Sequence, residues 1–148
     1  YDGIRFGNAR NLFGDEAKRR IMLGTYSSSA GYADKYFEKA ARVRTLVIRD
    51  FSEAFEKVDV IISPVSASMP FKIGEEVTDP LRLYLMDLLT IPSSLAGLPG
   101  LAIPVGFSEE NLPIGMQIIG PRWSEEKLFT VGEQYQSITN WHKKSPKK

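Results

Sequence analysis

The chain has 148 residues, of which 43% are hydrophobic and 25% are charged, and its formal net charge is +1. These proportions are those of an ordinary globular domain, and they argue against a disordered or fibrous protein. A chain of this length can also bury a hydrophobic core. Because the sequence has no cysteine and a single histidine, His142, it excludes disulfides, thiolate metal sites and a histidine-based zinc cluster.

The N-terminal part of the sequence predicts two helices. Asp15 and Glu16 begin a run of helix-forming residues that we expect to end at Gly24, since acidic residues suit the start of a helix and glycine suits its end. From residue 33 to 58, apolar residues recur every three or four positions, which indicates a long amphipathic helix. We expect its apolar face to pack against a sheet and its charged face to be solvated. The apolar face comprises Tyr36, Val43, Val47, Phe51 and Phe55, and the solvated face includes Lys39 and Arg42.

A strand and a further helix are expected next. The β-branched run from Val58 to Pro64 is typical of a buried strand, which the proline ends. Asp79 and Pro80 suit the N-cap and the first position of a helix, which we expect to end near Pro92. This alternation of helices and strands favours an α/β fold.

An uncharged stretch of sixteen residues, Leu89 to Pro104, follows that helix and contains three prolines and two glycines. It is too short, and too often interrupted by proline, to span a membrane as a helix. We therefore expect it to be buried in protein as irregular backbone. Since buried irregular backbone must find partners for its N–H and C=O groups, such segments often line sites.

The C-terminal part predicts a hairpin and a last helix. Two strand-like runs, residues 100–107 and 113–120, are separated by a polar loop, and Pro104 indicates that the first lies at a sheet edge or a bulge. Ser124 suits the N-cap of a helix over residues 125–138. The apolar face of that helix carries Leu128, Val131 and Tyr135.

Few residue clusters suggest chemistry by themselves. Ser27–Ser29 and Ser93–Ser94 have no neighbouring histidine or lysine to activate a serine, so a role in turns or at helix ends is favoured. His142 stands beside a lysine-rich tail and is interpreted as a surface residue. We interpret residues 1–140 as one domain and residues 141–148 as a solvated basic tail, which is too short to indicate nucleic-acid binding.

Two charged positions differ from the scattered surface charges. Arg19 and Arg20 precede an apolar run on a helix, so one of them is expected to turn toward the apolar face. Asp87 is the only charge in the nine residues 83–91, and a buried carboxylate is costly without a partner. The residues alone do not decide between two interpretations of Asp87. It is either a binding residue or a carboxylate that caps backbone groups of the next segment.

Four segments carry a more specific signal: "FGDEAKRRIMLGTYSSSAGY", "KAARVRTLVIRDFSEAFEKVDVIISP", "DPLRLYLMDLLTIPSSLAGLPGLAIPVGF" and "LPIGMQIIG". In this order they resemble the C-terminal part of the amidase signature family, over nearly the whole chain. Within the family, the chain is most similar to the A subunits of tRNA-dependent amidotransferases, which serve the conversion of Glu-tRNA(Gln) to Gln-tRNA(Gln) and sometimes of Asp-tRNA(Asn) to Asn-tRNA(Asn). The resemblance implies the family's α/β fold, a mixed β-sheet covered by helices, of which this chain is expected to be the C-terminal portion only. It also places the stretch from Leu89 to Pro104 beside the substrate pocket.

The resemblance further implies which residues bind substrate. Arg20 matches the family arginine that holds the carboxylate of glutamine, and Asp87 matches the aspartate that holds its α-ammonium. The planar donors of arginine suit a carboxylate, and aspartate is a strong partner for an ammonium. A direct salt bridge between Arg20 and Asp87 that only joins two helices is the structural alternative. Catalysis in the family uses a lysine and two serines in a Gly/Ser-rich signature that has no match here, so we expect no catalytic residue and no metal ligand in this chain.

The same resemblance implies partners and cofactors for a whole protein, namely the B and C subunits of the amidotransferase. Glutamine would be hydrolysed, and the ammonia would pass to the B subunit, which uses ATP and magnesium to activate misacylated Glu-tRNA and contacts the tRNA. A small C subunit would bridge the other two. No cofactor of this chain itself and no membrane contact are expected, and a bacterial cytoplasm is favoured over a mitochondrial or plastid matrix. The alternatives are a general amidase of the family and a catalytically silent structural fragment.

Two departures from the family pattern stand out. Only four residues, 8–11, separate "RFG" from "LFG", where relatives have a longer stretch that includes a helix, so we expect either a deletion or missing residues there. Pro64 to Ala67 keeps only the first proline of a Pro-Thr-x-Pro run that is usual in relatives.

Overall fold

The computed structural model describes residues 13–29, 33–74 and 84–145 and divides the chain into two compact units. The first unit, Tyr1–Arg44, contains helix α2 (Asp15–Ser28) and the beginning of helix α3 (Ala33–Phe55). The second unit, Thr45–Lys148, contains the rest of α3 and all the strands of the described residues. Each unit is described below by itself.

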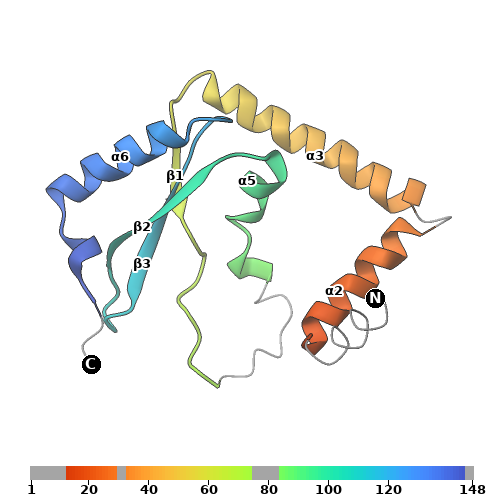
Figure 1. Cartoon of the computed structure of the whole chain (residues 1–148), viewed down its shortest axis with the longest axis horizontal. Helices are drawn as coiled ribbons and strands as arrows, with labels where there is room; N and C mark the ends of the chain where they lie inside the picture. Colours follow the sequence, from red (N-terminus) through yellow and green to blue (C-terminus); the bar gives the residue numbers. More distant parts are fainter. Residues whose placement is uncertain (1–12, 30–32, 75–83, 146–148) are drawn as a thin grey trace, which may run out of the picture. The chain divides into compact units, whose positions relative to one another are not determined.

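The second unit is organised around a small antiparallel sheet (Figure 1). Strand β3 (Pro113–Ile119) lies in the middle, between β1 (Ile61–Pro64) and β2 (Gly100–Phe107). The hairpin predicted from residues 100–120 is confirmed as β2 and β3. Pro104 lies on an edge strand of this sheet and beside a register shift, as the sequence predicts, because proline has no N–H to give to a neighbouring strand.

One face of the sheet forms the core with helix α6 (Glu125–Ile138). Side chains alternate along a strand, so Met116 and Ile118 of β3 share this face, and Ile118 is fully buried at 0% exposure. Ile118 packs in one cluster with Ile103 of β2 and Leu128 of α6. Val131 and Tyr135 pack against the same cluster, which confirms the predicted apolar face of the last helix.

The ends of α6 are fixed by further contacts. Ser124 is the N-cap residue, as predicted, but its hydroxyl donates to the carbonyl of Pro121 at 2.6 Å and does not accept a bond from the helix. Lys127 Nζ lies 2.7 Å from Asp59 Oδ1, and this contact lowers the pKa of Asp59. After α6, the short helix η1 (Trp141–Lys143) brings the Trp141 ring edge-on to Phe107 of β2, with ring centroids 6.0 Å apart.

Helix α3 forms as predicted, and its predicted apolar face is buried only in part. Tyr36 and Val43 are exposed, the latter at 52%, while the side chains near the C-terminal end of the helix are half-buried. Phe55 lines a hollow together with Leu98 and with Ala96, which is the last residue of helix α5 (Ile91–Ala96). The apolar face of the sheet is covered by α6, whose Leu128 packs with Ile103 and Ile118.

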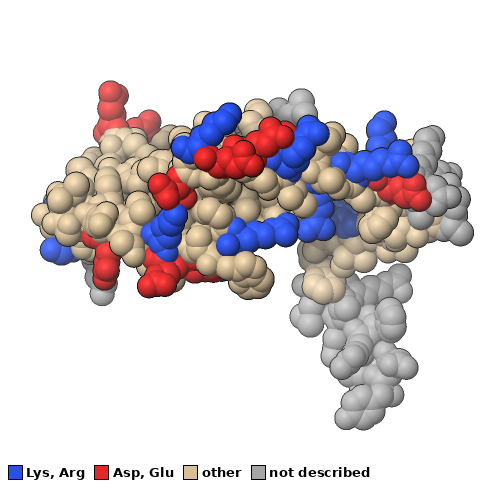
Figure 2. Space-filling view, turned by 90° about the horizontal axis from the view of Figure 1, so that it is seen from above, with Lys and Arg blue, Asp and Glu red and all other residues tan. Residues whose placement is uncertain are grey.

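The solvated face of α3 is confirmed. Lys39 and Arg42 are exposed, and Arg42 lies 3.7 Å from Glu38 of the preceding turn. On the face seen from above in Figure 2, basic and acidic side chains are interspersed. This pattern is typical of a helix surface in contact with water.

Three predicted helix boundaries need correction. Helix α2 continues through Gly24 to Ser28, because glycine is only mildly unfavourable inside a helix. The start of the helix predicted at Asp79 lies outside the described residues. Its predicted end near Pro92 is wrong: the chain turns at residues 87–90, and Pro92 lies in the first turn of a new helix, α5, where its missing N–H costs nothing.

The core between the sheet and α6 makes a testable prediction. Leu128→Ala should lower the free energy of unfolding by about 2–5 kcal/mol, because it opens a cavity beneath Ile118. The matched control is Phe129→Ala on the same helix, whose side chain is 63% exposed, and it should cost less than about 1 kcal/mol. Urea denaturation of the two variants measures both values, and equal losses would contradict the assigned core.

Candidate functional site: the segment from Asp87 to Gly97

The uncharged stretch has more regular structure than we predicted. Thr90 N and Ile91 N donate to the carbonyl of Asp87 at 3.1 and 3.0 Å, which closes the turn before α5. Gly97 ends α5 in the left-handed conformation, with φ 68°, as is usual for a glycine after a helix. The expectation of irregular backbone is therefore wrong here, because a short helix satisfies most of these N–H and C=O groups internally.

Side chains from the sheet region hold this segment at both ends. At its beginning, Gln117 Nε2 of β3 donates to the carbonyl of Leu89 at 2.7 Å. At its end, Arg122 Nη2 donates to the carbonyl of Ala96 at 3.0 Å. Because Gln117 alternates with Ile118 along β3, its side chain leaves the sheet on the face opposite α6. The beginning of the segment therefore lies against the second face of the sheet. In Figure 1, α5 is seen beside the strands.

Burial in the segment is limited to its helix. Ser93 and Ala96 are buried, at 7% and 1% exposure, and Ile103 farther along the predicted stretch is buried too, whereas Ile91 and Leu95 are exposed. The prediction that the whole stretch is buried is therefore wrong. Within α5, burial is limited to Ser93 and Ala96, which lie on one side of the helix.

Asp87 is exposed, so the expectation of a buried carboxylate is wrong as well. The capping interpretation is not supported either, because the turn is closed by the backbone carbonyl of Asp87. Thr90 Oγ1 donates to that same carbonyl at 3.2 Å. Among the described residues, the Asp87 carboxylate has no hydrogen bond or ion pair, which leaves its oxygens open to a ligand.

Arg20 lies on α2, in the first unit. Its Nε donates to Glu16 Oε1 at 2.9 Å, and Arg19 Nη2 lies 2.7 Å from Glu16 Oε2. Both arginines are exposed, Arg20 at 61%, so the prediction that one of them is buried is wrong. The reason is that α2 buries none of its residues within the described structure. The bond to Glu16 uses Nε and leaves the Nη groups of Arg20 for a further acceptor.

The structure therefore describes the two predicted site residues separately, Arg20 in the first unit and Asp87 in the second. Their joint role, as a substrate clamp or as a direct ion pair, stays a prediction.

The serine clusters act as predicted, at helix ends. Ser28 Oγ and Ser29 Oγ donate to the carbonyls of Gly24 and Tyr26 at 2.8 and 2.7 Å. Ser93 Oγ donates to the carbonyl of Thr90 at 3.0 Å. These hydroxyls are thus engaged with backbone groups. His142 is exposed, as expected of a surface residue.

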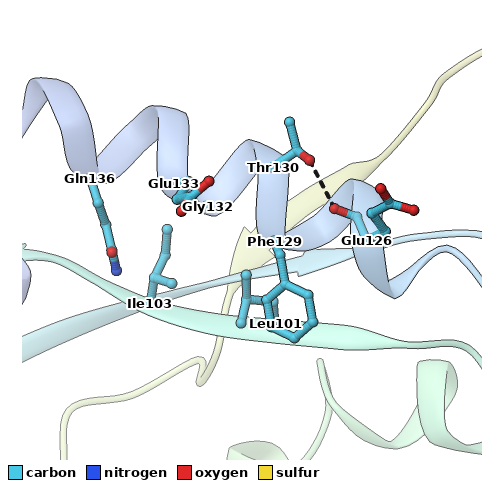
Figure 3. Close-up of a pocket in the computed structure, with 8 residues that line it drawn as sticks. All are labelled: Leu101, Ile103, Glu126, Phe129, Thr130, Gly132, Glu133 and Gln136. Carbon is cyan, nitrogen blue, oxygen red and sulfur yellow. Dashed lines mark hydrogen bonds between the residues drawn. The ribbon is translucent and has the colours of Figure 1, made fainter.

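A second hollow, of about 630 Å³, lies between α6 and β2 (Figure 3). Leu101 and Ile103 form its floor, and Glu126, Phe129 and Glu133 stand along α6. Its lining residues do not include Arg20, Asp87 or any serine, and the hydroxyl of Thr130, which lines it, donates to the backbone carbonyl of Glu126 at 2.9 Å. The sequence analysis did not find this hollow, because nothing in the spacing of α6 marks a gap beside it.

Two further properties concern the described residues alone. They contain no cluster of three or more potential metal-ligating side chains. None of their helices combines the length and the apolar character needed to cross a membrane.

The match to a family model now identifies the class of protein. Residues 3–129 match the model of the Amidase family, so the chain belongs to that family. Its fold is accordingly a portion of the amidase fold, with helices around a small three-stranded sheet. This confirms the fold class predicted from the sequence.

Several relatives of the chain share one name. The chain is 50% identical to the A subunit of glutamyl-tRNA(Gln) amidotransferase from Microcystis aeruginosa, over 99% of this chain and 33% of that protein. It is 55% identical to the A subunit from Rippkaea orientalis, over 90% of this chain and 28% of that protein. The chain thus spans about a third of the length of these relatives. The first alignment runs over 160 residues, more than the chain has, so that relative carries residues in this region without a counterpart here.

Solved structures agree with the sequence matches. The crystal structure of the Thermotoga maritima A subunit is 48% identical and superposes with a TM-score of 0.63, over 83% of this chain and 27% of that one. A crystal structure described as an amidase superposes with a TM-score of 0.70 at 23% identity, over 88% of this chain and 30% of that one. The latter likeness shows the fold alone.

The ion pairs of α2 make a pH prediction. Hydrogen bonds from Arg19, and then from Arg20, lower the pKa of Glu16 below its ordinary value. The pairs should therefore be intact above the ordinary pKa of glutamate and be lost as the pH falls through the lowered pKa. An NMR titration of the Glu16 carboxyl should show that Arg19→Gln raises its pKa more than Arg20→Gln does.

Arg42→Gln, on another helix, is the control for this titration and should leave the pKa of Glu16 unchanged. Identical titration curves for all three variants would contradict the pairing.

Proposed function

We propose that this chain is part of the glutamine-hydrolysing A subunit of a tRNA-dependent amidotransferase. The observation that carries the proposal is an identity of about half with named A subunits over almost the entire chain. Other solved amidase and hydrolase structures of this fold are far less similar, at 19–26% identity. The sequence is therefore closer to the amidotransferase branch than to those other members of the family.

In this proposal, the whole protein hydrolyses glutamine and passes ammonia to its partners. The B subunit uses ATP and magnesium to activate the γ-carboxylate of misacylated Glu-tRNA(Gln), which then accepts the ammonia, and the C subunit bridges the other two. The lysine and the two serines that catalyse hydrolysis in the family have no match in this chain. We place the protein in a bacterial cytoplasm, because the relatives compared are bacterial.

Within that reaction, the residues of this chain bind the substrate. The guanidinium of Arg20 would hold the α-carboxylate of glutamine, and the carboxylate of Asp87 would hold its α-ammonium. The open carboxylate of Asp87 supports this role, since among the described residues no cation neutralises it. Arg20 would keep Glu16 on Nε and offer its Nη groups to the substrate.

The first test concerns ammonia release. The full-length protein, purified with the B and C subunits, should release ammonia from glutamine and convert Glu-tRNA(Gln) to Gln-tRNA(Gln). The isolated 148-residue chain should release none above buffer, because it has no match to the serine and lysine signature. A coupled ammonia assay measures both. Turnover by the isolated chain, or an intact protein that hydrolyses other amides but not glutamine, would contradict the proposal.

The second test concerns the two substrate-binding residues in the full-length enzyme. Asp87→Asn and Arg20→Ala should each lower kcat/KM for glutamine by about one to three decades, because removing one partner of a charge pair that is buried in the complex typically costs roughly 2–5 kcal/mol. Simple primary amides, which lack both α-groups, should lose little activity. Steady-state kinetics on glutamine and on such an amide measure the difference.

The control is Asp50→Asn, which removes an exposed carboxylate of α3 and should leave both activities unchanged. If the two residues formed only a structural salt bridge, Asp87→Asn would lower the melting temperature and leave the kinetics of the remaining folded enzyme near wild type. An unchanged preference for glutamine over simple amides would defeat the assignment.

A further inference from the structure

The side chain of Gln117 connects the middle strand of the sheet to the turn that carries Asp87. It is buried, at 6% exposure, and its Nε2 donates to the carbonyl of Leu89 at 2.7 Å and to Ser63 Oγ at 2.9 Å. We propose that Gln117 is a positioning residue, which orients the Asp87 carboxylate for the α-ammonium of the substrate by fixing the carbonyl of Leu89. This inference rests on the proposed function.

The backbone between the two residues transmits this constraint. Leu89 lies two positions after Asp87, inside a turn that is closed by bonds from Thr90 N and Ile91 N to the carbonyl of Asp87. A turn closed in this way has little internal freedom. Fixing the Leu89 carbonyl against the sheet therefore fixes the direction in which Asp87 leaves the turn, although the Asp87 side chain itself is exposed.

A carboxamide suits this position because it supplies two N–H donors from one atom. Ser63 lies directly opposite Gln117 in the register of β1 and β3, so one N–H meets its hydroxyl. The other N–H is then available for the carbonyl of Leu89. Methionine fills a similar volume and donates neither bond, so Gln117→Met leaves the carbonyl of Leu89 without this partner.

The other end of the segment provides an internal comparison. Arg122 holds the carbonyl of Ala96 and so fixes the end of α5, whereas the Asp87 turn leads into the beginning of that helix. Arg122→Met removes an anchor of the same segment and leaves the turn at Asp87 closed. A loss of anchoring in general would affect both variants, whereas positioning of Asp87 would be affected by Gln117→Met alone.

The experiment uses the full-length enzyme, with glutamine and a simple primary amide that lacks the α-groups as substrates. Gln117→Met should raise KM for glutamine about tenfold, change kcat less than about threefold, and leave kcat/KM for the simple amide nearly unchanged. Arg122→Met and Ser63→Ala, which keep the bond to Leu89, should leave KM for glutamine near wild type. In the Asp87→Asn background, Gln117→Met should have no further effect on glutamine, because the residue it positions is already gone.

Two results would overturn the inference while leaving the proposed function intact. One is an equal loss on both substrates by Gln117→Met, which indicates a structural role. The other is full additivity of Gln117→Met and Asp87→Asn. If Asp87→Asn itself left the preference for glutamine unchanged, the substrate role of Asp87 would fail first, and the positioning role with it.

Gln117→Asn is the milder variant should Gln117→Met not fold, because it keeps the carboxamide but is one methylene shorter. A wild-type KM for glutamine in Gln117→Asn would also overturn the inference.

Discussion

The second unit depends on the alternation of side chains along the middle strand, β3. Ile118 points to one face and enters the core with α6, while its neighbour Gln117 points to the other face and holds the turn before α5. A single strand therefore joins an apolar contact on one side to a hydrogen-bonded contact on the other. Because the side-chain period of a strand is two, a shift of register by one residue would turn the amide toward α6 and the isoleucine toward the polar groups of Ser63 and Leu89. The apolar face thus fixes the register that the polar contact requires.

Elements with a strong local signal could be predicted from the sequence. The hairpin of β2 and β3, the last helix and the apolar face of that helix follow from periodicity and turn residues, and each is found as expected. The turn at Asp87 could not be predicted, because the apolar run continues through it. In addition, Pro92 is as compatible with the end of one helix as with the start of another. Burial on α3 was overestimated for a related reason. Spacing identifies an apolar face, but it does not say which helix covers the sheet.

The candidate site was predictable only in part. The positions of Arg20 and Asp87 came from a resemblance, and the residues alone suggested burial that the structure does not have. Gln117 was missed, although a signal was present: it is the only polar side chain in the apolar run from Met116 to Ile119. A single amide in such a run has to find partners when it is buried, and those partners lie far away in the sequence.

The contact between Gln117 and Ser63 joins residues 54 positions apart, whereas β2 and β3 are joined by a short loop. Loop closure costs more entropy the longer the loop, so the hairpin and the adjacent α6 can assemble as a local nucleus before β1 docks. In this order of assembly, the apolar face of β3 would be completed early, and the polar face, with the turn that carries Asp87, would be completed late. Substitutions on the polar face should accordingly act mainly on the rate of unfolding and those on the apolar face mainly on the rate of folding.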